Sequence, residues 1–138
     1  MNSNNYQKVV HLSLWIDDRI VLSKRNEPGK YHHGYWQDAG GKVSEGEDLL
    51  KAICREVSEE MDIYVHPNDL KLVDCFIYDK RKIKSFLFTM KGSSYLFNQI
   101  RNTEPDKCSD WQLFTLEEAL KLKRIVPSVK YYLENLNG

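Results

Sequence analysis

The chain has 138 residues, of which 41% are hydrophobic and 12% aromatic; this is typical of one globular domain and too short for a two-domain enzyme. Its 20 Lys and Arg balance 20 Asp and Glu, which argues against a nucleic-acid-coating role and against attraction to an acidic membrane surface. No apolar run approaches the roughly 20 residues that span a bilayer, and residues 1–5 lack the parts of a signal peptide. We therefore expect a cytoplasmic protein with a single domain over residues 1–138.

In chain order, the first predicted element is a β-hairpin. β-branched and aromatic residues fill Val9–Ile16, a polar break follows, and Ile20–Leu22 resume the apolar pattern. Glycines, Pro28 and several aromatic residues between positions 26 and 41 predict an ordered functional loop rather than a linker. Apolar residues then recur at spacings of three and four over Asp48–Met61, which predicts an amphipathic helix.

The second half of the chain predicts more strands followed by helices. Strands are expected at Leu70–Tyr78 and Ile83–Met90, joined by a charged turn as a meander, and at Trp111–Phe114. Short helices are expected at Leu116–Leu122 and from Pro127 to about Asn135. This order predicts an α/β fold with a mixed sheet and helices on its faces.

The three cysteines give no sign of metal or redox chemistry. Cys54, Cys75 and Cys108 are far apart and no C-x-x-C spacing is present, so free buried thiols are expected. A cysteine nucleophile is disfavoured, because no paired His and Asn stand at a recognisable spacing.

The most informative feature is a group of acids on the central helix. Glu56, Glu59 and Glu60 lie within one turn, on a face directed away from the apolar stripe, so three carboxylates are expected to converge. Like charges at these spacings repel by about 0.2–0.5 kcal/mol per pair, and on the helix only Arg55 is near enough to offset them. The oxygens suit a hard ion such as Mg²⁺; a solvated acidic helix face is the alternative.

The flanking residues favour the metal interpretation. The spacing from Gly41 to Ile63 matches the Nudix box, G-x5-E-x7-R-E-U-x-E-E-x-G-U with U apolar, and the chain resembles Nudix hydrolases over residues 41–63. The resemblance implies a Nudix-type α/β/α sandwich with a mixed central sheet. Eight of the nine specified positions are filled, by Gly41, Glu47, Arg55, Glu56, Val57, Glu59, Glu60 and Ile63.

Asp62 is the one departure from the box, because the family pattern has glycine there. Glycine suits a left-handed cap at a helix end, whereas Asp adopts that conformation at a cost of about 1 kcal/mol. We expect a small loss of stability without loss of activity. The extra carboxylate near the metal end also alters metal affinity, in a direction that the sequence leaves open.

The resemblance assigns roles to the acids of the box. It implies that Glu56 and Glu60 are metal ligands and that the carbonyl of Gly40 completes the metal shell. It makes Glu59 either a further ligand or the base that takes a proton from the attacking water. The implied cofactor is Mg²⁺, with Mn²⁺ as a substitute.

Arg55 and Glu47, by the same resemblance, are an orienting pair that holds the catalytic glutamates in place. Two structural alternatives stay open for them. The pair also fits a plain salt bridge at the helix start, and Ser44 with Glu47 fits a capping box.

Three weaker features suggest a nucleoside triphosphate as substrate, as in MutT-like members. Arg25 ends a strand before the glycine-rich loop, where relatives reach substrate phosphates, although a plain surface arginine also fits. The segment from Trp36 to Val43 resembles W-x-x-x-G-G-K-V, and this resemblance implies substrate-binding positions at Trp36, Gln37 and Gly41. Glu104 begins a segment resembling E-P-E-K-C-x-x-W and is a candidate extra acid at the metals, or an ordinary surface acid.

Aromatic residues near this site have two interpretations each. Trp36 is either a packed anchor for the loop or a stacking platform for the base, and packing is the commoner fate. Alternating aromatic residues along the strands either floor the base pocket or belong to the core; they are Phe76, Tyr78, Phe86 and Phe88.

The resemblance therefore implies a Mg²⁺-dependent pyrophosphohydrolase that converts nucleoside triphosphates, including oxidised or non-standard ones, to the monophosphate and pyrophosphate. Rival substrates are dinucleoside polyphosphates, ADP-ribose or nucleotide sugars, and capped RNA. From another class, a catalytically silent nucleotide-binding module is the alternative. The expected partner is a small-molecule nucleotide, with no membrane and no nucleic acid beyond capped RNA, and the protein is a monomer or a homodimer.

Overall fold

The computed structural model describes residues 5–136. The expectation that residues 1–5 are not a signal peptide therefore concerns residues that lie largely outside the described part. The predicted hairpin is present as β1 (Gln7–Ile16) and β2 (Arg19–Lys24), with Trp15 opposite Ile20. Within the described part of the chain, no helix has the length and hydropathy needed to cross a membrane.

A mixed sheet forms the centre of the fold, as the sequence predicted. The central path runs β3-β2-β1-β6-β5, while β4 pairs with β1 and β7 with β2. Among the paired strands of residues 5–136, only β1 and β6 run parallel, in register from Gln7 opposite Ile83 to Ile16 opposite Gly92. The remaining strands are β3 (Trp36–Gln37), β4 (Ala39–Lys42), β5 (Lys71–Tyr78), β6 (Ile83–Gly92) and β7 (Gln112–Thr115).

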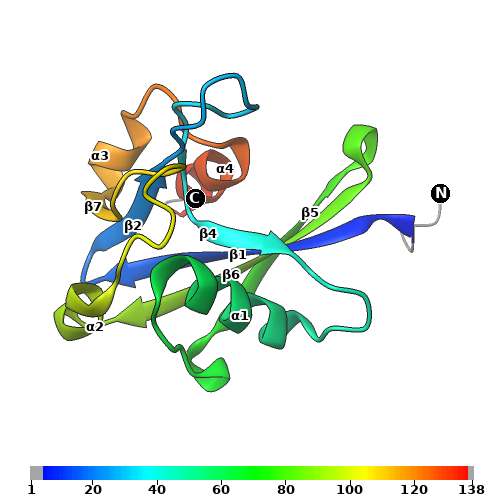
Figure 1. Ribbon diagram of the computed structural model, residues 1–138, viewed down its shortest axis with the longest axis horizontal. Helices are drawn as coiled ribbons and strands as arrows, with labels where there is room; N and C mark the ends of the chain where they lie inside the picture. The colour runs from blue at the N-terminus through cyan, green and yellow to red at the C-terminus, as the bar shows by residue number, and fades with distance from the viewer. Residues whose placement is uncertain (1–4, 137–138) are drawn as a thin grey trace.

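Helices cover both faces of this sheet and make an α/β/α sandwich. Figure 1 shows α1 (Leu49–Met61) on one side of the long β1–β6 pair and α4 (Pro127–Asn135) on the other, with α3 (Leu116–Leu120) next to α4. One buried cluster joins α1 to β1, β4 and β6, and a second joins β2 to α3 and α4. Burial of these two apolar faces fixes the helices against the sheet.

The central helix forms for the local reasons that its sequence indicates. The Asp48 side chain accepts a hydrogen bond from the backbone N–H of Leu50 at 2.9 Å and so caps the N-terminus. The buried residues Ala52, Ile53, Val57 and Met61 make one stripe against the sheet. The helix ends at Asp62, whose left-handed φ of 56° and ψ of 38° match the conformation expected at that position. The acids lie beside this stripe on the same rigid element, and Glu56 and Glu60 are next to β4.

Three local details differ from the sequence analysis or were absent from it. The segment 26–41 contains the short strands β3 and β4, because Gly40 allows β4 to approach β1 closely: a Cβ there would lie 2.2 Å from the carbonyl oxygen of Val10. The helix α2 (Ser94–Gln99) was not predicted, since its six residues are too few to show a helical period. Cys75 is exposed on the outer strand β5, and Cys54 and Cys108 are only half-buried.

Candidate active site

Arg55 organises the acidic face of α1. Its guanidinium donates two hydrogen bonds to the Glu47 carboxylate, from Nε at 2.8 Å and from Nη2 at 2.9 Å. Nη1 also donates to Glu56 at 3.0 Å and to Glu59 at 3.3 Å, and Nη2 donates to the Lys42 carbonyl at 3.0 Å. The fork geometry of arginine permits this simultaneous contact with three carboxylates.

Glu47 lies in a turn before the helix rather than in its cap. Its side chain accepts from the backbone N–H of Ser44 at 3.0 Å, while Asp48 is the residue that caps α1. The capping-box alternative is therefore wrong. Hydrogen bonds from Arg55 and from the Ser44 backbone lower the pKa of Glu47 to about 2, so Glu47 stays a charged partner for Arg55.

Glu56 reaches over β4 at a position where only glycine leaves room. A Cβ built on Gly41 would lie 2.4 Å from Cδ of Glu56 and 2.5 Å from each carboxylate oxygen. Burial raises the pKa of Glu56, and the Arg55 ion pair opposes that effect. The glycine at the start of the box thus makes space for a carboxylate next to the strand.

Glu60 is the most perturbed of the three acids. Its Oε1 accepts from the backbone N–H of Gly40 at 3.0 Å. Burial and the negative charges of Glu56, Glu104 and Asp38 nevertheless raise the pKa of Glu60 to about 8. A carboxyl group this poorly stabilised as an anion favours a nearby cation.

The three carboxylates do not converge on one point as the sequence predicted. Among residues 5–136, no three His, Cys, Asp or Glu side chains stand together in an arrangement that could hold a metal ion. The reason is visible in the contacts: Arg55 binds Glu56 and Glu59, whereas Glu60 turns to the Gly40 amide. The all-oxygen donor set and the raised pKa values of Glu56 and Glu60 nonetheless fit a hard divalent cation.

A second segment brings Glu104 to this cluster. Thr103 Oγ1 donates to the carbonyl oxygens of Glu59 and Glu60, at 2.7 and 3.1 Å, and Trp111 Nε1 donates to that of Glu60 at 3.3 Å. These bonds tie the loop to the C-terminal turn of α1. Glu104 and Glu60 line the same small acidic pocket of about 130 Å³, as the extra-acid interpretation of Glu104 requires.

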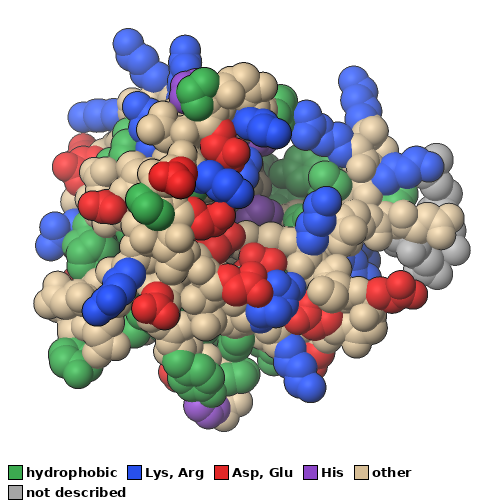
Figure 2. Space-filling view, in the orientation of Figure 1, with side chains coloured by type: hydrophobic (Ala, Val, Ile, Leu, Met, Phe, Trp, Pro, Cys, Tyr) green, Lys and Arg blue, Asp and Glu red, His purple; other side chains and the backbone are tan. Residues whose placement is uncertain are grey.

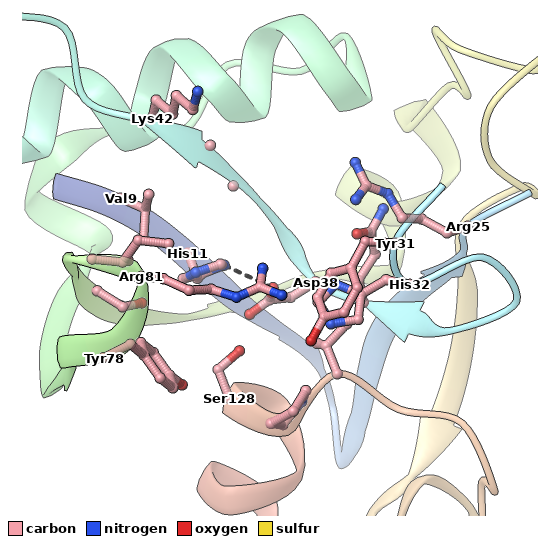
Figure 3. A pocket seen from close by; sticks show the side chains of 17 residues that line it. Val9, His11, Arg25, Tyr31, His32, Asp38, Lys42, Tyr78, Arg81 and Ser128 are labelled. Carbon is pink, nitrogen blue, oxygen red and sulfur yellow. Dashed lines mark hydrogen bonds and ion pairs between the residues drawn. The ribbon is translucent and has the colours of Figure 1, made fainter. Parts of the chain in front are cut away.

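A larger, mainly apolar pocket of about 330 Å³ lies next to the acidic pocket; we call it the base pocket (Figure 3). This volume falls within the roughly 300–1,000 Å³ usual for small-molecule sites. The two pockets share one wall, made of Arg25, Gln37, Asp38 and Gly40. The other lining residues are Val9, His11, Tyr31, His32, Gly41, Lys42, Tyr78, Arg81, Ile83, Ser85, Val126, Pro127 and Ser128.

Several predicted substrate residues line these pockets. Arg25 and Gln37 line both, and Gly41 lines the base pocket. Arg25 Nε is buried and has no hydrogen-bond partner among the described residues, so this arginine retains a donor for a ligand. Figure 2 shows Asp and Glu side chains gathered in the middle of this face with Lys and Arg among them.

The structure places Trp36 elsewhere. Its ring packs edge-on against Phe114 at 4.9 Å between centroids and belongs to the core cluster formed with α3 and α4. It does not line the base pocket, which favours the packed-anchor interpretation. Of the four alternating aromatic residues, only Tyr78 lines that pocket: Phe88 is buried in the core, Phe86 packs against it, and Phe76 contacts Tyr131.

The most buried polar pair of the site, His11 and Asp38, was not predicted from the sequence. His11 Nδ1 lies 3.2 Å from Asp38 Oδ1, and the side chain of Asp38 is only 2% exposed. Burial opposes a charge on His11, but the Asp38 carboxylate outweighs it and raises the pKa of His11. The available signals were a histidine within an apolar strand pattern and an acid before Ala39-Gly40.

Comparisons with known proteins identify the family of this chain. The model of the NUDIX domain family matches residues 6–136. The dihydroneopterin triphosphate diphosphatase of Escherichia coli K12 is 34% identical over 89 residues, which cover 64% of this chain and 53% of that protein. The 8-oxo-dGTP diphosphatase of Buchnera aphidicola from Acyrthosiphon pisum is 36% identical over 74 residues, or 51% of this chain and 60% of that protein.

The fold is also found in solved structures. A MutT NUDIX hydrolase from Burkholderia pseudomallei superposes with a TM-score of 0.78 at 23% identity, over 94% of this chain and 97% of that one. The matches to the two curated relatives span little more than half of each relative's length, 53% and 60%. The family model, by contrast, accounts for nearly all of the described residues. This chain is therefore a member of the Nudix domain family.

Proposed function

We propose that this protein is a Mg²⁺-dependent pyrophosphohydrolase that cleaves nucleoside triphosphates to the nucleoside monophosphate and pyrophosphate. The observation that carries the proposal is the shared wall between the two pockets. An apolar pocket large enough for a bicyclic base lies directly beside a pocket lined by Glu60 and Glu104. A ligand that fills both has a flat ring at one end and a polyphosphate chain at the other.

The two curated relatives support this substrate class. The substrates in their names, dihydroneopterin triphosphate and 8-oxo-dGTP, both join a bicyclic ring to a triphosphate. The raised pKa of Glu60 also fits the proposal, because a cation between this carboxylate and the phosphates would stabilise its ionised form. Mn²⁺ is expected to substitute for Mg²⁺ at these oxygen ligands.

Each side chain has a separate task in this proposal. Arg25, on the shared wall, binds the phosphate chain through its unpartnered Nε and steadies the charge that builds up during cleavage. Glu59 is 57% exposed and accepts the proton of the attacking water, whose oxygen forms the new bond to phosphorus as the phosphoanhydride bond breaks. Arg55 and Glu47 hold Glu56 and Glu59 in position.

The residues that would hold the cation are Glu56 and Glu60, with the carbonyl of Gly40. A bound Mg²⁺ would supply the positive charge that the carboxylates and the polyphosphate require next to one another. Glu104, which lines the acidic pocket together with Glu60, would assist there. We assign one domain to the chain and expect a monomer or homodimer in the cytoplasm.

The test is product analysis with a substrate panel. Purified protein is incubated with Mg²⁺ and with normal and oxidised nucleoside triphosphates, dinucleoside polyphosphates, ADP-ribose and capped RNA, and the products are resolved. Release of monophosphate and pyrophosphate from the triphosphates is the expected result. Preferred cleavage of another member of the panel would contradict the proposed substrate class.

Loss of all turnover would distinguish a binding protein from an enzyme. Inactivity with every substrate, in Mg²⁺ and again in Mn²⁺, would overturn the proposal in favour of a nucleotide-binding module. Asp62→Gly, which restores the box glycine, is then the first variant to assay, because regained activity would locate the defect at the end of α1.

A further inference from the structure

The base pocket holds one carboxylate that the protein leaves half-satisfied. Asp38 Oδ1 is paired with His11, but Oδ2 is buried and has no hydrogen-bond partner among residues 5–136. Figure 3 shows the carboxylate in the middle of the pocket, with His11 on one side and Tyr31 on the other. A buried, unpaired carboxylate oxygen is costly, and a donor from a bound ligand, a water or an ion would remove that cost.

The surroundings of Asp38 favour a flat ring as that ligand. Tyr31 and Tyr78 line the pocket with Val9 and Ile83, so its walls suit an aromatic face more than a sugar. The Arg81 guanidinium lies 4.0 Å from the centroid of Tyr31, which brings the β5–β6 turn and the 26–35 loop together beside the pocket. A ring that packs against these walls would direct its edge toward the buried Asp38 carboxylate.

An ionised carboxylate accepts hydrogen bonds and donates none. The ring edge that it recognises must therefore carry N–H groups, and two adjacent ones use both carboxylate oxygens. With its hydrogen on Nδ1, His11 donates to Oδ1 and fixes the carboxylate's orientation, which leaves Oδ2 and a second lone pair of Oδ1 free for the ligand. A ring with an acceptor at this edge, such as adenine, is rejected by repulsion between lone pairs.

We propose that Asp38, held by His11, is the specificity-determining residue of this site and selects bases with a ring N–H next to an exocyclic amino group. This donor pair is the 2-amino-4-oxopyrimidine edge of guanine and of pterins. The inference rests on the proposed function, since it names the class of base that the triphosphate carries. Asp38 is a contact to substrate, and His11 is a positioning residue that acts through it.

The test compares ligands that differ in one donor. GMP and IMP differ only in the 2-amino group, and their dissociation constants are measured by calorimetry for the wild type and for Asp38→Asn. The wild type is expected to bind GMP about 10- to 100-fold more tightly than IMP, the range for a hydrogen bond to a charged group. In Asp38→Asn this ratio falls to within about threefold of one, and IMP, which contacts Asp38 through the ring N–H alone, loses less affinity than GMP.

Further variants and ligands separate the roles. Asp18→Asn makes the same chemical change on an exposed turn and leaves the GMP/IMP ratio at the wild-type value. His11→Ala lowers the ratio, and His11→Asn, whose amide can replace Nδ1–H, restores it. GMP and dGMP form a second pair, which differs only in the ribose 2′-hydroxyl. If Asp38 contacted the ribose, Asp38→Asn would change the ratio of their dissociation constants and not the GMP/IMP ratio.

The outcomes are distinct. A GMP/IMP ratio near one in the wild type, an unchanged ratio in Asp38→Asn, a change confined to the GMP/dGMP pair, or binding of neither nucleotide would overturn the assignment. Turnover of GTP and ITP, measured in parallel, tests the proposed function separately. Selective binding of GMP without turnover would contradict the proposed hydrolase activity and support Asp38 as the selecting residue. Turnover with equal binding of GMP and IMP would support the hydrolase activity and contradict the role of Asp38.

Discussion

Substitution of Glu60 by glutamine is expected to stabilise the metal-free protein while it impairs function. The amide keeps an oxygen that accepts from the Gly40 N–H, which lies 3.0 Å from Oε1, and it removes the negative charge. Burial and the charges of Glu56, Glu104 and Asp38 are what disfavour that charge in the folded state. The substitution therefore removes an unfavourable interaction without opening a cavity.

The magnitude follows from the shift in proton affinity. The pKa of Glu60 rises from an ordinary 4.5 to about 8 in the folded chain. Because a tenfold change in proton affinity corresponds to about 1.4 kcal/mol, ionised Glu60 destabilises the fold by at most about 5 kcal/mol. Since the folded state binds the proton more tightly, this loss is absent below pH 4.5, develops as pH rises, and is complete above about pH 8.

The assay is urea unfolding in EDTA at a series of pH values from about 5 to about 9. The free energy of unfolding of the wild type should fall relative to Glu60→Gln as pH rises, and the difference should level off above about pH 8. Glu134→Gln, an exposed glutamate on α4, is the matched control and should follow the wild type. With saturating Mg²⁺ the order should reverse, because the cation binds only the folded wild type well.

Two results would refute this reasoning. One is an equal pH dependence of stability in the wild type and Glu60→Gln, which would mean that Glu60 is not held away from solvent beside other acids. The other is a variant that is less stable than the wild type above about pH 8 in EDTA, which would mean that the ionised carboxylate is a favourable partner in the fold.

Three further predictions concern the same site. Glu59→Gln should lower kcat by about a hundredfold or more with an unchanged unfolding midpoint, because the amide cannot accept a proton but can still accept from Arg55. Asp62→Gly should raise the free energy of unfolding by about 1 kcal/mol, since φ there is 56°, and thermal unfolding measures it. Gly41→Ala should lower kcat/KM by at least about tenfold, because its Cβ would collide with the Glu56 carboxylate. Full turnover in Glu59→Gln or Gly41→Ala, or a lower unfolding temperature in Asp62→Gly, would contradict the respective prediction.

The sequence alone determined the parts of this protein whose physics is local. The apolar period over residues 48–61 predicted α1, and helical spacing then put Glu56, Glu59 and Glu60 within one turn, outside the buried stripe. The left-handed conformation of Asp62 could likewise be predicted, because a helix end needs it whatever surrounds the helix. The box spacing also anticipated the pairing of Arg55 with Glu47, which the structure contains.

Only the tertiary structure decided the base pocket and the state of the acids. His11 and Asp38 are 27 residues apart and meet because β4 pairs with β1, and a pairing partner cannot be deduced from either strand's own pattern. Trp36 was indistinguishable from a stacking platform until α3 and α4 closed over it. The raised pKa of Glu60 depends in part on the charges of Asp38 and Glu104, which approach from two other segments of the chain. Burial and long-range charge are properties of the assembled chain, whereas periodicity and capping are properties of the sequence itself.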